Sequence, residues 1–291
     1  MKKVNPIEQA HRFASEAMNS TFEAYIIHPD KKYASQAAYE GFREIELLEK
    51  DLSRYIDNSE ITQISRLCCD REMTVSPWTM ECLAAAAKIF AMTEGAFDIT
   101  MDKDRPVKNG PVRSESGFSR LALDIDSFKV SVSGEPVTVD LGGIGKGYAL
   151  EKMAEVLIEW DITDFLIHGG RSSVLARGAC GGSGGWPVRI TNQLKGGVIT
   201  KAKLLDSAMA SSGLQKGEHI INPRTGSAVS HSLASWVIHN DAAIADGLST
   251  AFIIMKDNDI QQLCEKESAK AIIIDCGNPN VVFAGDWRHE S

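Results

Sequence analysis

Hydrophobic residues recur at two different spacings along this chain, and the spacing separates expected helices from expected strands. Positions 31–55 carry apolar side chains three or four residues apart, which is typical of a helix with one buried face. These apolar positions are Ala38, Phe42, Ile45, Leu48 and Leu52. A second helix is predicted from Ser76-Pro77 to about Thr93, because serine is a good N-cap and proline suits the first helical position.

Further along the chain the pattern predicts a helix that ends at Trp160, another over 241–256, and several strands. The expected strands lie at 18–28, 137–141, 164–168, 186–190, 232–239, 271–275 and 281–284. Strands that alternate with helices, with some strands adjacent, predict an α/β (α+β) mixed-sheet layered domain. We expect one domain over residues 1–291, with an excursion loop at the glycine- and charge-rich residues 101–117.

Composition narrows the classes of function. The 291 residues carry a formal net charge of −8 and no marked run of basic residues, which disfavours a nucleic-acid partner. No stretch approaches the roughly 20 apolar residues that a membrane span needs, and no signal peptide is visible. The six cysteines form no Cys-x-x-Cys pair, so reduced thiols and a cytoplasmic location are expected.

The most informative segment is Val139–Ala149, an expected strand that runs through a glycine turn into a helix. Four glycines within six positions let the backbone approach a ligand closely and expose its N–H groups. With Asp140 before the turn and Lys146 at the start of the helix, the segment suits a phosphate-bearing ligand. A tight connection with a solvated lysine is the alternative. The glycine spacing matches neither a Walker loop nor a dinucleotide-binding fingerprint.

The expected helix 241–256 contains one charged residue between Ala242 and Met255, namely Asp246. Thr250 follows one turn later, so its hydroxyl and the Asp246 carboxylate lie side by side. Two oxygen ligands at this spacing suit a hard cation such as Mg²⁺. The alternatives are an Asp–Thr hydrogen bond or a salt bridge to Lys146.

Three other segments carry candidate chemistry. In Glu94–Asp98 a glycine ends a helix, after which Phe97 and Asp98 are placed to contact an aromatic ligand, or else serve as a core residue and a turn residue. His219, beside a short apolar stretch, is a candidate general base or a structural histidine. In the segment from His168 to Ser173, two glycines again permit close approach of a ligand.

Taken in this order, these segments resemble the ApbE family, the FAD:protein FMN transferases. The resemblance covers about Met18 to Met255. It rests on Met18-Asn-Ser-Thr21, Leu52-Ser-Arg-Tyr55 with Ser59-Glu-Ile61, Thr93-Glu-Gly-Ala-Phe-Asp98, Val139–Ala149, Gly169-Gly170, His219-Ile-Ile-Asn-Pro-Arg-Thr-Gly226 and Ala245-Asp-Gly-Leu-Ser-Thr250.

The resemblance implies one α/β domain that binds FAD in a long cleft with Mg²⁺ on the pyrophosphate. It implies transfer of the FMN moiety to a threonine hydroxyl of an acceptor flavoprotein, with release of AMP. The implied metal ligands are Asp246, Thr250 and the backbone carbonyl of Gly143. The implied FAD contacts are Met18, Tyr55, Ala96, Phe97, Asp98, Asp140, Lys146 and the backbone near Ile220.

The reaction so implied needs a group that takes the threonine proton, and His219 is the first candidate and Asp98 the second. The family often has acidic residues where Arg171 and Asn222 stand, so two negative charges are missing near the expected site. Gly143 replaces a frequent alanine. Two alternatives to transfer stay open: Mg²⁺-dependent hydrolysis of FAD to FMN and AMP, and a carrier that holds FAD without reaction.

Overall fold

The computed structural model describes residues 9–100, 116–182, 184–191, 197–213, 221–223, 227–229, 232–275 and 281–287. Its centre is an eight-stranded sheet, and every strand pair described is antiparallel. In spatial order the strands are β1 (His11–Ala17), β2 (Ser20–Ile26), β6 (Phe165–Gly169), β7 (Ser173–Arg177), β10 (Ser207–Gly213), β13 (Ser232–His239), β14 (Lys270–Asp275) and β15 (Val281–Ala284). The predicted combination of helices and sheet in layers is confirmed, in its α+β form.

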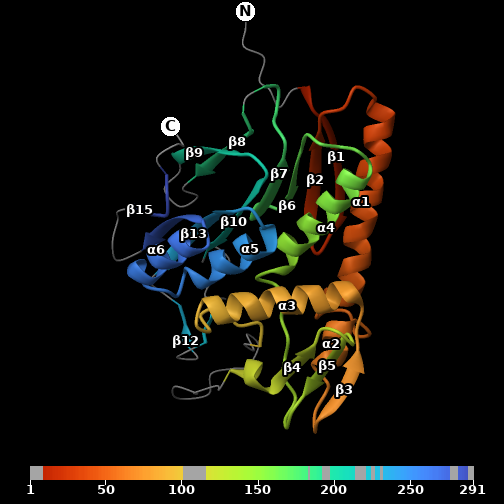
Figure 1. The fold of residues 1–291 in the computed structure, drawn as a ribbon, viewed down its shortest axis with the longest axis vertical. Helices are drawn as coiled ribbons and strands as arrows, with labels where there is room; N and C mark the ends of the chain where they lie inside the picture. The colour runs from red at the N-terminus through yellow and green to blue at the C-terminus, as the bar shows by residue number, and fades with distance from the viewer. Residues whose placement is uncertain are drawn as a thin grey trace, which may run out of the picture.

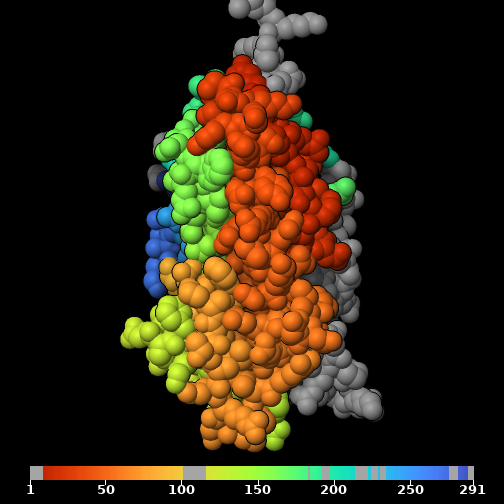
Figure 2. All heavy atoms as spheres, turned by 90° about the vertical axis from the view of Figure 1, so that its right-hand side faces the viewer, coloured from red at the N-terminus to blue at the C-terminus, as the bar shows by residue number. Residues whose placement is uncertain are grey.

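Helices cover one face of this sheet (Figure 1). They are α1 (Lys31–Leu52), α4 (Gly145–Glu159), α5 (Ala242–Ala251) and α6 (Asp257–Lys266). The sheet alternates as a half-covered strand should: Phe22, Ala24 and Ile26 point into the core beneath these helices, and Tyr25 points to the other face. In Figure 2 the side chains of α1 and α4 lie side by side along the molecule.

The opposite face of the sheet is covered in part by the hairpin of β8 (Trp186–Thr191) and β9 (Val198–Leu204). The fully buried Trp186 packs there with Leu166 and Ile238 in a second hydrophobic cluster. Two short strands, β11 (Ile221–Asn222) and β12 (Ser227–Ala228), form an antiparallel pair of their own.

A smaller sheet lies at the far end of the molecule, beyond α3 (Pro77–Met92) (Figure 1). Its order is β3 (Arg71–Thr74), β5 (Lys129–Val132) and β4 (Leu121–Asp124), with α2 (Glu60–Ile64) and a short 3-10 helix, η2 (Gly117–Arg120), beside it. As predicted, α3 begins after Ser76, whose hydroxyl accepts a hydrogen bond from the Thr79 N–H, with Pro77 at the first helical position.

Two expected elements differ from the structure. Residues 137–141 form no strand, because the N–H groups of Val139 and Asp140 donate to the Ser65 hydroxyl and the Ile99 carbonyl instead of to a neighbouring strand. The helix expected over 241–256 ends at Ala251, and a turn separates it from α6. Continuous hydrophobicity marked this segment as buried but did not mark where the helix ends.

The boundaries of the expected excursion loop cannot be compared in full, since residues 101–115 lie outside the described residues. The prediction of one domain over 1–291 stays a prediction. Among the described helices, none has both the length and the apolar character that a membrane span requires.

Candidate functional site

Asp246 lies on the buried side of α5, directly against the first turn of α4. Its side chain is 3% exposed, and its Oδ2 accepts a hydrogen bond of 3.0 Å from the Gly147 N–H. Ser173 at the start of β7 donates to Oδ1 at 3.3 Å. The two helices can approach this closely only because residue 147 is glycine: a Cβ there would lie 2.1 Å from the Ala242 carbonyl oxygen.

Burial raises the pKa of the Asp246 carboxyl above its usual range, because a charge is costly to remove from water. The positive charge of Lys146 and the two hydrogen bonds oppose this effect and only partly offset it. Within the described part of the chain, no basic side chain forms a salt bridge with Asp246. Among the described residues, the carboxylate therefore has hydrogen-bond donors but no contacting counter-charge.

Thr250 lies one turn further along α5, as the sequence spacing predicts. Its Oγ1 is 3.0 Å from the Ser212 Oγ on β10. A Cβ placed on Gly143 would lie 3.2 Å from Thr250 Oγ1 and 3.1 Å from the Phe97 ring. The glycine turn, the end of β10 and α5 are thus brought together, although Gly143 and Thr250 are 107 residues apart in sequence.

The three residues implied as metal ligands offer a carboxylate oxygen, a hydroxyl oxygen and a backbone carbonyl oxygen. A carboxylate has about four acceptor positions, and Asp246 uses two of them within the described residues. An all-oxygen donor set with one negative charge fits a hard cation that also keeps substrate and water ligands. The described residues contain no group of three His, Cys, Asp or Glu side chains that could bind a metal, so a softer metal has no such cluster here.

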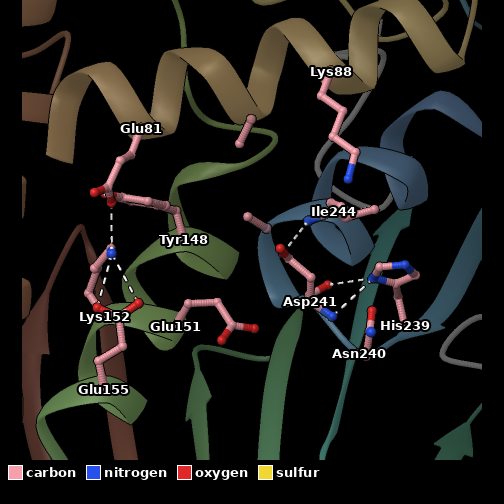
Figure 3. Close-up of a pocket in the computed structure, with 12 residues that line it drawn as sticks. Glu81, Lys88, Tyr148, Glu151, Lys152, Glu155, His239, Asn240, Asp241 and Ile244 are labelled. Carbon is pink, nitrogen blue, oxygen red and sulfur yellow. Dashed lines mark hydrogen bonds and ion pairs between the residues drawn. The ribbon is translucent and has the colours of Figure 1, made fainter. Parts of the chain in front are cut away.

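A polar cavity of about 480 Å³ opens on another side of α5, between α3, α4 and the end of β13 (Figure 3). Its acidic side chains form hydrogen bonds and ion pairs with neighbouring residues. Glu151 accepts from the Ala242 N–H at 2.6 Å and from Arg177 at 2.9 Å, and burial raises its pKa. Lys152 bridges Glu81 and Glu155.

This network fixes the start of α5. Asp241 caps the helix by accepting from the Ile244 N–H at 2.9 Å, and its own N–H donates to His239 Nδ1 at 3.0 Å. Together with Glu151, it satisfies N–H groups that a helix start leaves without intrahelical partners. Because Asp246 follows within the next turn, the cavity residues hold its carboxylate against α4.

The turn between α1 and α2 carries Tyr55, whose side chain is 85% exposed. The Arg54 guanidinium lies 5.3 Å from the centre of the Tyr55 ring and 3.1 Å from Asp140 Oδ2. Asp140 Oδ1 also accepts from the Gly142 N–H at 2.8 Å. Arg54 and Asp140 therefore connect an exposed aromatic ring to the glycine turn.

The segment Ala96–Asp98 follows α3 through a turn in which Glu94 and Gly95 have positive φ angles. The Gly95 N–H donates to the Phe90 carbonyl at 2.8 Å, which is the six-residue bond of a Schellman ending. Ala96 and Phe97 are buried, and the Asp98 oxygens accept from the Thr100 N–H and hydroxyl and from the Ser116 hydroxyl.

Met18 lies in the two-residue turn between β1 and β2, where it and Asn19 have φ angles of 50° and 53°. This turn lies at the same end of the main sheet as the turn after Gly169, since the Gly170 N–H donates to the Thr21 carbonyl. Lys146 lies in the first turn of α4 beside Gly147. Arg171 is exposed at the β6–β7 turn.

His219 and Ile220 lie outside the described residues, so their roles stay predictions. The structure also adds residues that the sequence reasoning did not single out for a role: Ser173, Ser212 and Arg54. Ser173 stands in a segment already marked by its two glycines. Nothing in the local sequence marks Ser212, because its partners lie on α5, 37 and 38 residues away.

Comparison with known proteins finds relatives over most of this chain. A FAD:protein FMN transferase of Haemophilus influenzae is 25% identical over 300 residues, covering 90% of this chain and 85% of the relative. One of Klebsiella pneumoniae is 22% identical, covering 93% and 85%.

The fold is similar to that of solved structures. The flavin transferase ApbE of Vibrio cholerae superposes with a TM-score of 0.81 at 21% identity, covering 96% of this chain and 98% of that one. The flavinyl transferase ApbE of Pseudomonas stutzeri gives 0.82 at 20% identity, covering 96% and 94%. The family model described as the ApbE family matches residues 18–273, and this chain therefore belongs to the ApbE family.

Proposed function

We propose that this protein transfers the FMN moiety of FAD to a threonine hydroxyl of an acceptor flavoprotein, with Mg²⁺ as cofactor and AMP as the second product. Two contacts near the start of α4 support the proposal: the Asp246 carboxylate accepts a hydrogen bond from the Gly147 N–H, and Gly143 lies close to the Thr250 hydroxyl. The names of its relatives support the transfer of FMN from FAD to a protein.

In this reaction the threonine oxygen attacks the phosphorus on the FMN side of the pyrophosphate. A new O–P bond forms, the P–O bond to AMP breaks, and its electron pair stays on the AMP phosphate. The threonine proton goes to a base. The substrate and the leaving group are both anionic, so the site must supply positive charge to lower the barrier.

Asp246, Thr250 and the Gly143 carbonyl would hold the Mg²⁺ ion. Bound there, Mg²⁺ supplies charge neutralisation of the pyrophosphate and Lewis acidity. Lys146 adds a second positive charge, and the dipole of α4 adds partial positive charge at the start of the helix. The N–H groups of Gly145 and Gly147 are not available to the ligand, since they donate to the Leu141 carbonyl and to Asp246.

The flavin would lie along the surface from the glycine turn toward the exposed Tyr55 ring, whose free area suits stacking on an aromatic ring system. Arg54 already lies over the Tyr55 ring. The proposed FAD contacts are Met18, Tyr55, Ala96, Phe97, Asp98, Asp140, Lys146 and Ile220.

For the base we favour His219 over Asp98. The unperturbed pKa of histidine lies near neutrality, which suits proton transfer at physiological pH. Both oxygens of Asp98 already accept hydrogen bonds from Thr100 and Ser116, so fewer of its acceptor positions are open to the threonine hydroxyl.

One incubation tests the proposal: the protein with FAD, Mg²⁺ and a threonine-containing acceptor flavoprotein, followed by AMP release and acceptor mass. Released AMP with an acceptor heavier by one FMN supports transfer. Released AMP with free FMN shows hydrolysis, and FAD binding without AMP shows a carrier; either result contradicts the proposal. His219→Ala should slow AMP release while FAD binding persists, whereas His28→Ala, in the turn before α1, should change neither.

We also propose that the protein acts in the cytoplasm, with an acceptor in the same compartment. The support is that no disulfide joins two cysteines within the described residues, of which Cys82, Cys180 and Cys264 are buried. Fractionation of cells that express the protein with its natural termini tests this location.

A further inference from the structure

Hydroxyl groups from β10 and α5 form a hydrogen-bonded chain beside Asp246. Ser249 Oγ donates to the Asp246 backbone carbonyl at 2.8 Å. Ser212 Oγ lies 2.9 Å from Ser249 Oγ and 3.0 Å from Thr250 Oγ1. Each hydroxyl has a single proton, so the direction of these bonds can be worked out.

The direction follows from the end of the chain at Ser249. The Ser249 hydroxyl donates its only proton to the Asp246 carbonyl. In the bond between Ser212 and Ser249, Ser212 must therefore be the donor and Ser249 the acceptor. Ser212 then has no proton left for Thr250 and can only accept there. The Thr250 proton therefore points to Ser212, and the lone pairs of Thr250 Oγ1 are left for another partner.

This arrangement differs from the usual behaviour of threonine in a helix. A helical threonine commonly donates its hydroxyl proton to the carbonyl three or four residues earlier. For Thr250 the carbonyl four residues earlier is that of Asp246, and Ser249 already donates to it. A hydroxyl that binds a cation must direct its proton away from the cation, and the Ser212 acceptor meets this requirement.

We propose that Ser212 is a positioning residue for the cation site. It accepts a hydrogen bond from the Thr250 hydroxyl and so orients the Thr250 oxygen as a cation ligand. The inference rests on the proposed function, since it assumes that Thr250 binds the metal. Residues that orient metal ligands in this way typically change metal affinity on the order of 10- to 100-fold when they are mutated.

The neighbouring strand offers a matched control. Ser235 on β13 is the register partner of Ser212 on β10, so both side chains point to the helix-covered face of the sheet. Ser235 is fully buried, and its Oγ has no hydrogen-bond partner within the described part of the chain. Ser235→Ala removes the same atom from the same face without touching the hydroxyl chain.

The test measures Mn²⁺ affinity by electron paramagnetic resonance and Mg²⁺ affinity by calorimetry, on the full chain with FAD present. Ser212→Ala should weaken cation binding about tenfold, and Thr250→Ala at least as much. Ser212→Thr keeps a hydroxyl and should restore most of the affinity, while Ser235→Ala should match the wild type. Circular dichroism and thermal unfolding without metal check that each variant folds. If Ser212→Ala does not fold, the test rests on Ser212→Thr, in which a loss of cation binding would contradict the role of the Ser212 hydroxyl.

An absent metal site and an unimportant Ser212 hydroxyl would give different results. If the wild type binds neither cation, the metal part of the proposed function is wrong, and this inference is wrong with it. If the wild type binds cations, Thr250→Ala loses them and Ser212→Ala keeps wild-type affinity, only the role of Ser212 is overturned. Equal losses in Ser212→Ala and Ser235→Ala also overturn it, because a general packing effect would then explain both.

Discussion

Two carboxylates on opposite sides of the main sheet, one buried and one partly exposed, show how differently a negative charge can be held. Asp246 faces the helices and accepts hydrogen bonds from Gly147 and Ser173, with no contacting cation among the described residues. Glu23 on β2 faces the other side, where Arg12 donates two hydrogen bonds to it at 2.9 and 2.6 Å and Tyr25 donates a third at 2.8 Å.

Their pKa values move in opposite directions as a result. The hydrogen bonds from Arg12 lower the pKa of Glu23 to about 2, whereas burial raises the pKa of Asp246. Glu23 carries its counter-charge within the fold, so its charge is already balanced. Asp246 is held by hydrogen bonds without a contacting counter-charge among the described residues, which supports the proposal that a cation binds there.

The largest expected effect comes from removing the unbalanced carboxylate. Asp246→Ala should lower Mg²⁺-dependent AMP release about a thousandfold, because metal assistance contributes several kcal/mol to such a step. Glu23→Ala, the matched change on the other face, should leave turnover near that of the wild type. Steady-state AMP release checks both, and full activity in Asp246→Ala would rule out its assignment as a metal ligand.

A stability effect should follow from filling the contact that brings α4 to Asp246. A Cβ on Gly147 would overlap the Ala242 carbonyl, so Gly147→Ala should lower the free energy of unfolding by about 3 kcal/mol. Gly145→Ala is the control in the same turn, since the nearest atom to its Cβ would be Leu141 Cβ at 3.9 Å. Denaturant unfolding measures both; equal stabilities would show that α4 can shift without cost.

The raised pKa of Asp246 has a measurable sign. The folded state holds this proton more tightly than the unfolded state, so the stabilising effect is fully present below the ordinary aspartate pKa of 3.8 and is lost as pH rises through the folded value. Without metal, Asp246→Asn should therefore gain stability relative to the wild type as pH rises. Chemical unfolding at several pH values measures this, and added Mg²⁺ should stabilise only the wild type.

Glu23 should give the mirror image, with the smallest effect. Its pKa is lowered from 4.5 to about 2, so its contribution is present above pH 4.5 and is lost as pH falls toward 2. The difference in free energy of unfolding between Glu23→Gln and the wild type should therefore shrink as the pH falls from 4.5 toward 2. Arg12→Ala should reproduce the loss of pH dependence, and a gap that is constant with pH would show that Arg12 and Glu23 do not interact in solution.

The sequence predicted best where a single helix carries the information. The period of apolar residues predicted α1 and α4, and Ser76 and Pro77 marked the start of α3. The spacing of Asp246 and Thr250 placed both on one side of α5 before any contact was known. The roles of these residues as ligands stay predictions, as do those of His219 and Ile220 in residues outside the described part.

Other features were missed because nothing local marks them. β1 alternates exposed and half-buried positions without a strong apolar face, and the strands of the smaller sheet are only four residues long. The segment 137–141 has the composition of a strand, but its N–H groups donate to Ser65 and Ile99 instead of to a neighbouring strand. A strand forms only where a neighbouring strand is available for hydrogen bonding, and the tertiary structure determines which segments become neighbours.

The sequence by itself determined that a glycine turn precedes a helix with Lys146 in its first turn, and that one carboxylate stands alone in a buried helix. Only the tertiary structure decided that the two meet, through the Gly147 N–H and the close approach of α4 to Ala242. It also decided that Ser212 accepts a hydrogen bond from the Thr250 hydroxyl, because these residues lie on a strand and a helix and are 38 positions apart in sequence. The period of apolar residues gives information about a single helix or strand. The counter-charge of a carboxylate and the direction of a hydroxyl hydrogen bond depend instead on residues that become neighbours only when the elements pack together.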